Sequence, residues 1–304
     1  MLTVSNYHYI RENFATKYPS IFGVTPSMFK RQLLLLKDKA DFVSGMDLIT
    51  NGDEILNSKN NYYFITFDDG LKEQFQFALP ILDELQIPSV LFANSRNHED
   101  KKVSTVHKIH LLRSIIAPSD FLKLLANPNN NIAISNSDYV KAKNTYVYDD
   151  QESALLKYWL NFKMNFYDQE EIIKAIFDNY FDENEVLEAL YMSENQIVQL
   201  GDKGFLGSHT HNHYPIGLLS ENEIEFELEN SKVFLKKLTN TPIDLVAYPY
   251  GTPDSCTTQV AEIAKKVGYK YGFTTTRGVN TIENNPLLLN RYDCNDLPGG
   301  KNYK

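Results

Sequence analysis

The stretch YYFITFDDG spans residues 62–70 and ends an apolar run with two adjacent carboxylates and a glycine. Consecutive aromatic and β-branched side chains predict a buried β-strand over residues 62–67. Gly70 allows the chain to turn immediately afterwards, which presents Asp68 and Asp69 at the carboxyl end of this strand. The pattern therefore predicts a strand end that carries reactive groups.

Predicted strands and helices alternate on both sides of this stretch. An opening strand and a helix with an apolar face over residues 29–36 come before it, and apolar residues at helical spacing follow over 75–85. Pro80 predicts a kink or a late start in that second helix. Further predicted strands lie at 42–43, 89–94, 205–208, 245–248, 271–275 and 287–289. Ser220 with Glu223 predicts a capped helix start, and a helix is predicted over 260–267 with Gly268 ending it. This alternation predicts βαβ units, whose strands end at one common face.

The central region has a different character. It is polar, its apolar residues follow helical spacing, and a run rich in asparagine at 127–131 predicts a loop. Ser119, the pair Asp168 and Glu171, and the pair Ser193 and Gln196 predict helix starts. We therefore predict an α/β unit in two parts, residues 1–95 and 196–304, separated by a mainly helical insertion over 96–195.

Composition narrows the class of protein. The chain has 304 residues, 42% of them hydrophobic, so core material is ample, and the formal charge of −9 argues against a nucleic-acid partner. Neither a signal peptide nor an apolar run long enough for a membrane span is visible, which predicts a cytoplasmic protein. Cys256 and Cys294 are too few for a disulfide framework and are expected to be packed small residues. The oligomeric state is not predicted.

A second cluster, HTHNH, spans residues 209–213. The spacing of His209 and His213 puts both rings on one face of a helix or of a tight loop. With one strand-end aspartate they form the ligand set of a catalytic Zn²⁺-type site, and the other aspartate is left as a base. The residues thus predict metal-assisted hydrolysis. We expect Zn²⁺, with Co²⁺, Ni²⁺ or Mn²⁺ as alternatives set by availability.

Three motifs of the sequence resemble one known family. TFDDG at 66–70, HTHNH at 209–213 and AYPYG at 247–251 are similar to the first three motifs of the polysaccharide deacetylases with a NodB homology domain, carbohydrate esterase family 4. The resemblance covers residues 1–94 and 200–297, and the AYPYG form is similar to a subgroup of that family. It implies an α/β fold, a distorted (β/α) barrel of the NodB type, here with a helical insertion.

The resemblance also implies roles for individual residues. Asp69, His209 and His213 would hold the metal, and Asp68 would be the general base that deprotonates the attacking water. The backbone N–H of Tyr250 would donate to the oxyanion of the tetrahedral intermediate.

Two features depart from the family pattern. The arginine that usually precedes the proline of the third motif is missing, and Arg291 is our candidate to replace it in space. No histidine follows His213, so the usual Leu-x-His that supplies the general acid is absent. We assign the acid to His107, while the alternatives left open are His110, His8, Asp293, His211 or none of these.

The expected function is metal-dependent removal of acetyl groups from an N-acetylated amino sugar, in a polysaccharide or in a glycan, lipid-linked or nucleotide-linked precursor. One alternative keeps the metal but changes the bond, as in a deformylase, an O-deacetylase or another C–N hydrolase. The other alternative is a non-catalytic metal-binding or sugar-binding protein. The missing Leu-x-His favours the binder, whereas Asp68 argues against it, because a binding module needs no base.

Overall fold

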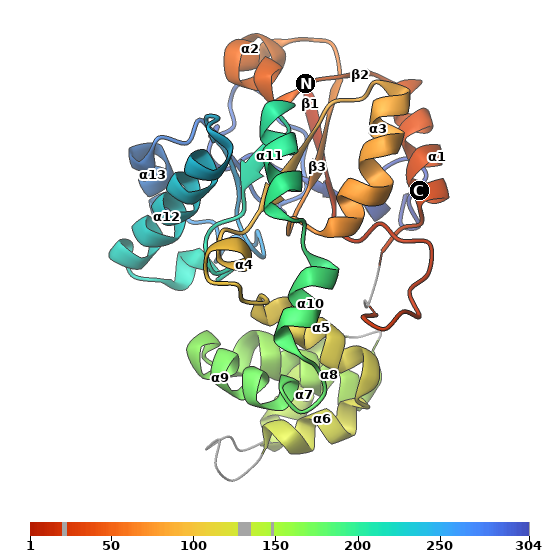
Figure 1. Cartoon of the computed structure of the whole chain (residues 1–304), viewed down its shortest axis with the longest axis vertical. Helices are drawn as coiled ribbons and strands as arrows, with labels where there is room; N and C mark the ends of the chain where they lie inside the picture. Colours follow the sequence, from red (N-terminus) through yellow and green to blue (C-terminus); the bar gives the residue numbers. More distant parts are fainter. Residues whose placement is uncertain (20–22, 127–134, 147–148, 304) are drawn as a thin grey trace. The chain divides into compact units, whose positions relative to one another are not determined.

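The computed structural model describes residues 1–19, 23–126, 135–146 and 149–303. They divide into two compact units (Figure 1). The first comprises residues 1–13, 22–102 and 187–304, and the second comprises 14–21 and 103–186. The second unit therefore includes a short stretch near the N-terminus as well as part of the central region. The predicted domain boundaries at 95 and 195 stay a prediction, and the predicted loop at 127–131 lies outside the described residues.

The first unit is built on one parallel sheet. Its strands are β1 (Leu2–Tyr7), β2 (Asp41–Phe42), β3 (Tyr62–Phe67), β4 (Ser89–Ala93), β5 (Leu206–Ser208), β6 (Leu245–Ala247), β7 (Tyr271–Phe273) and β8 (Tyr292–Asp293). The order is β7-β6-β5-β4-β3-β1-β8, with β2 beside β3, and every pair of strands is parallel. Their carboxyl ends therefore share one edge, as the alternation of elements predicts.

The sheet is curled. The ring of Phe273 on β7 lies 5.6 Å from the ring of Phe64 on β3 and 5.6 Å from that of Phe92 on β4. Because β6 and β5 separate β7 from β4 in the strand order, these contacts require the sheet to bend around a core. All three rings belong to a buried apolar cluster. The predicted distorted (β/α) barrel is confirmed.

A short segment, residues 289–293, joins the two ends of the sheet. Leu289 forms a single bridge to Phe273 of β7, and Tyr292 and Asp293 then pair with β1. The predicted strand at 287–289 is therefore wrong. Only Leu289 pairs with the edge strand, because the chain leaves β7 at once to reach the opposite edge.

The helices of the first unit confirm several local signals. They are α1 (Pro26–Lys37), α2 (Gly45–Asn57), the π-helical turn η1 (Gln74–Ala78), α3 (Leu79–Leu85), α4 (Arg96–Glu99), α11 (Glu194–Asp202), the short turn η4 (Ile216–Leu218), α12 (Glu221–Thr239), α13 (Thr258–Val267) and the short turn η5 (Cys294–Asp296). Pro80 lies in the first turn of α3, so the late start is confirmed. Ser220 and Glu223 form the predicted capping box of α12. Gly268 ends α13 with φ 94°.

The described part of the second unit is helical. Its elements are α5 (Thr105–Ile115), α6 (Pro118–Leu125), α7 (Asn136–Thr145), α8 (Gln151–Tyr158), the π-helical turn η3 (Trp159–Lys163) and α9 (Phe166–Phe177), and α10 (Glu183–Leu190) begins there. Two predicted helix starts are wrong. Pro118 occupies the first turn of α6, so Ala117 rather than Ser119 precedes the helix. Asn165 caps α9 three residues before Asp168 by accepting from Tyr167 N–H.

Two further features concern the length of the helices and the state of the two cysteines. Among the described helices, none is long and apolar enough to cross a membrane. Cys256 and Cys294 are both buried and form no disulfide, which confirms the expectation of packed small residues.

Candidate metal and catalytic site

The end of β3 turns sharply in order to present two carboxylates. Asp68 still belongs to the sheet, since its N–H donates to the Tyr7 carbonyl at 3.0 Å. Asp69 and Gly70 then adopt φ values of 77° and 62°. Successive strand residues normally point to opposite faces, and this left-handed turn removes that restriction. Both carboxyl groups are buried, so the sequence YYFITFDDG places two acidic side chains inside the first unit.

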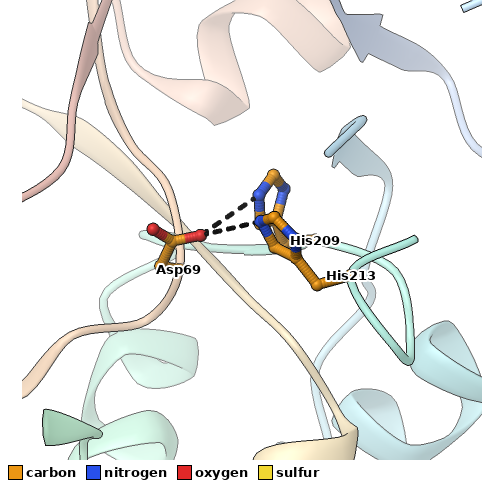
Figure 2. A group of neighbouring side chains, drawn as sticks. All are labelled: Asp69, His209 and His213. Carbon is orange, nitrogen blue, oxygen red and sulfur yellow. Dashed lines mark ion pairs between the residues drawn. The ribbon is translucent and has the colours of Figure 1, made fainter. Parts of the chain in front are cut away.

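The two histidines come from the loop that follows β5. His209 N–H donates to the Ala93 carbonyl at 2.9 Å, and the chain then turns through Thr210 and His213, each with φ 62°. The predicted helix or tight loop is a tight loop. His209 Nε2 lies 3.4 Å from Asp69 Oδ1, and His213 Nε2 lies 3.2 Å from the same oxygen. Figure 2 shows both rings turned toward that oxygen.

Asp69, His209 and His213 fit a divalent cation. One oxygen and two imidazole nitrogens lie within 4.8 Å of one another, and all three side chains are buried. His209 Nδ1 lies 2.7 Å from the Ala247 carbonyl, which fixes the proton on Nδ1 and directs the Nε2 lone pair to Asp69. Burial lowers the pKa of His209, but the carboxylates of Asp68 and Asp69 outweigh it and raise this pKa. The same negative potential stabilises a cation.

Asp68 lies against a buried arginine. Arg291 Nη1 and Nη2 each donate to one oxygen of Asp68 at 2.8 Å, and Arg291 Nε donates to the Thr274 carbonyl at 2.8 Å. Burial of Asp68 raises its pKa, but the positive charges of Arg291 and His209 outweigh this effect and hold the pKa below its usual value. Asp68 is therefore ionised at neutral pH. Arg291 reaches it from the segment 289–293 that closes the barrel.

Tyr250 lies at a third strained turn, after β6. Its φ is 63°, as is that of Gly251, where a Cβ would lie 2.5 Å from the Thr275 nitrogen. The Tyr250 side chain is 43% exposed, and its ring packs edge-on against His213 at 5.5 Å between centroids. The structure thus brings Tyr250 beside a proposed ligand. The role of its N–H toward an oxyanion stays a prediction.

Residues with positive φ angles are concentrated at these turns. Seven described non-glycine residues have positive φ, and four of them are Asp69, Thr210, His213 and Tyr250. Such conformations are unfavourable for residues with a Cβ and persist where the surroundings hold them, which is common at functional sites. The concentration at three strand ends therefore supports a site at this edge of the sheet.

His8 lies closer to Asp68 than the sequence suggested. It follows β1 directly, its Nε2 lies 3.9 Å from Asp68 Oδ2, and its side chain is 41% exposed. The buried amide of Gln74 donates to the carbonyls of both His8 and Asp68, at 2.9 and 2.6 Å. The signal available in the sequence was a histidine at the end of a predicted strand. Its proximity to Asp68 required the pairing of β1 with β3.

The other candidates for the acid lie in different surroundings. His107 is in α5 of the second unit, where its ring lies 5.9 Å from that of His110, and its assignment as the acid stays a prediction. His211 Nδ1 forms a hydrogen bond with Ser95 Oγ at 2.7 Å. Asp293 accepts from the Asn295 N–H at 2.8 Å and so caps η5.

Comparison with known proteins finds a partial match to one family. The sequence model of the family described as polysaccharide deacetylase matches residues 169–272. This range is about a third of the chain, and over it the chain is similar to the polysaccharide deacetylase family. The matched range includes His209, His213 and Tyr250, whereas Asp68 and Asp69 lie before it. A search of curated proteins returned no match.

Solved structures of deacetylases share the fold. The chain is 18% identical to the Streptococcus pyogenes deacetylase PplD in complex with acetate, covering 96% of this chain and 91% of that one with a TM-score of 0.60. It is 18% identical to IcaB from Ammonifex degensii, covering 96% and 90%, with a TM-score of 0.55. It is 15% identical to a de-N-acetylase from Aggregatibacter actinomycetemcomitans, covering 96% and 95%, with a TM-score of 0.55. At these identities the likeness shows the fold alone.

Proposed function

We propose that this protein is a metal-dependent hydrolase that removes the acetyl group from an N-acetylated amino sugar of a polysaccharide or of a glycan precursor. The observation that carries the proposal is the convergence of Asp69, His209 and His213 on one point, next to the arginine-paired carboxylate of Asp68. The match of residues 169–272 to the polysaccharide deacetylase family model supports the acetyl group as the group removed. A glycan, a lipid-linked sugar and a nucleotide-linked sugar stay open as substrates, and a cytoplasmic location rests on the sequence alone.

The residues of the site divide the chemistry between them. A divalent ion held by Asp69, His209 and His213 would acidify a water molecule and polarise the acetyl carbonyl. Asp68, kept ionised by Arg291, accepts the proton of the attacking water. The backbone N–H of Tyr250 donates to the carbonyl oxygen as negative charge develops there.

The leaving amine needs a proton, and we propose His8 as its donor. His8 is partly exposed and lies 3.9 Å from Asp68, so it can meet a substrate from the solvent side of the base. Changing His8 to asparagine is expected to lower kcat about 10²-fold with little change in KM, because a positioned acid contributes about 10²- to 10⁴-fold. Steady-state acetate release measures it.

His107→Asn is the comparison for this experiment. A lower kcat in His107→Asn, with His8→Asn close to wild type, would identify His107 and not His8 as the general acid. Thermal unfolding of both variants is needed because His107 is fully buried, so its replacement can also disturb the packing of the second unit.

The proposed function is tested by acetate release from a panel of N-acetylhexosamine oligomers and nucleotide sugars. N-formylated and O-acetylated analogues in the same panel separate the other deacylases. We expect acetate from at least one N-acetylated substrate and little product from the analogues. A protein that binds one metal per chain yet releases no acyl group from any compound would instead be a metal-binding or sugar-binding protein.

A further inference from the structure

Helix α12 places a buried carboxylate against residues 209–213, which we call the histidine loop. Glu227 is 2% exposed. Its Oε2 accepts from the backbone N–H groups of His211 and Asn212 at 3.1 and 2.7 Å, and its Oε1 accepts from Asn212 Nδ2 at 2.5 Å. One side chain therefore binds three donors within the turn that separates His209 from His213.

That turn does not follow from local backbone preference. Thr210 and His213 both have φ 62°, and a β-branched residue such as Thr210 rarely adopts this conformation. The surroundings must therefore hold the loop in place.

The loop is held from two sides. On one side its carbonyls are bound by residues 94–96: Asn94 Nδ2 donates to the His209 carbonyl, and Ser95 and Arg96 N–H donate to the Thr210 and His211 carbonyls at 3.3 Å each. On the other side its N–H groups meet Glu227.

Glu227 is itself fixed relative to the strand that carries His209. One helical turn further along α12, Ser231 Oγ accepts a hydrogen bond from Ser208 Oγ at 2.8 Å, and Ser208 is the last residue of β5. The position of α12 relative to β5 therefore fixes where the carboxylate binds the loop. A carboxyl group suits this place because its oxygens accept and three donors face it. Burial raises the pKa of Glu227, and the hydrogen bonds from Asn212 and His211 oppose this rise.

We propose that Glu227 is a positioning residue that sets the relative orientation of the two imidazoles, so that both Nε2 atoms meet Asp69 at distances suited to one metal ion. The proposal rests on the proposed metal-dependent function. Glu227 contacts the loop between the ligands and does not touch the metal position itself. Its removal should change the affinity and the geometry of the site more than it changes the fold.

Binding of Co²⁺ to the metal-free full chain tests this proposal, because the visible absorption of Co²⁺ reports coordination geometry as well as occupancy. Glu227→Ala is expected to raise the Kd for Co²⁺ about 10- to 100-fold, the usual effect of losing a group that orients metal ligands, and to alter the absorption spectrum. Glu227→Gln keeps an acceptor for the backbone N–H groups, and the Asn212 amide can rotate to match it. This variant is expected to stay within about threefold of wild type.

Glu229→Ala is the matched control, since Glu229 lies on the same helix but is exposed, and its Kd and spectrum should equal those of wild type. If Glu227→Ala does not fold, Glu227→Asp replaces it, because the shorter side chain withdraws the carboxylate from the loop. A folded Ala or Asp variant with the wild-type Kd and spectrum would overturn the proposal. So would a Gln variant as weak as Ala, which would assign the effect to charge. Wild-type protein that binds no Co²⁺ would instead contradict the proposed function itself.

Discussion

Replacing Asp68 by asparagine is expected to lower kcat for acetate release by about 10²- to 10⁴-fold, because a positioned general base contributes a factor of that size. Asparagine still accepts from Arg291 through one oxygen, but it cannot take the proton of the attacking water. Bound metal and KM should stay close to wild type, since Asp68 is not among the three proposed ligands. Steady-state kinetics with metal analysis of the same sample measure this.

The adjacent residue supplies the control. Asp69→Asn is expected to lose the metal together with the activity, whereas Asp68→Asn should lose activity alone. Wild-type turnover in Asp68→Asn would remove Asp68 from the mechanism, and loss of metal from that variant would make it a ligand. Because the change weakens a buried ion pair, which can cost about 3–5 kcal/mol of stability, thermal unfolding must show that the assayed protein is folded.

Removing the metal with a chelator is expected to lower activity about 10³-fold or more. Polarisation of a carbonyl by a cation is worth several kcal/mol, and each 1.36 kcal/mol corresponds to about a factor of ten in rate. Adding Zn²⁺, Co²⁺, Ni²⁺ or Mn²⁺ back should restore turnover to different extents, and the most effective ion identifies a candidate for the native metal. Acetate release before chelation, after it and after each addition gives the measurement.

A second readout separates loss of metal from loss of fold. Asp69, His209 and His213 lie at strand ends and not in the apolar cluster around Phe64, Phe92 and Phe273, so the metal-free protein should stay folded. Its Tm should nevertheless fall, because an ion that binds only the folded state stabilises it. Full activity in a sample whose metal content is far below one per chain would contradict metal dependence.

Local signals predicted much of the first unit because they act between neighbouring residues. Strand β3 ends where the apolar run meets Asp68. Pro80 starts α3 late, and Gly268 ends α13, for reasons of backbone geometry that need no distant partner. Two predicted helix starts failed where local signals competed, since Pro118 in α6 and the Asn165 cap of α9 come before Ser119 and Asp168. The other failure depended on the path of the chain. The short run at 287–289 is apolar enough for a strand, yet only Leu289 pairs with β7.

Local patterns in the sequence specify the residue types of the candidate site, the alternation of strands and helices, and the placing of reactive groups at strand ends. Which of these groups meet depends on the tertiary structure. Arg291 and Asp68 are 223 positions apart and form a bidentate ion pair because residues 289–293 cross from β7 to β1. His8 reaches Asp68 because β1 pairs with β3, and Glu227 reaches the histidine loop because α12 packs against β5. These contacts depend on strand order and helix packing, which join residues far apart in the chain and leave no local pattern in the sequence.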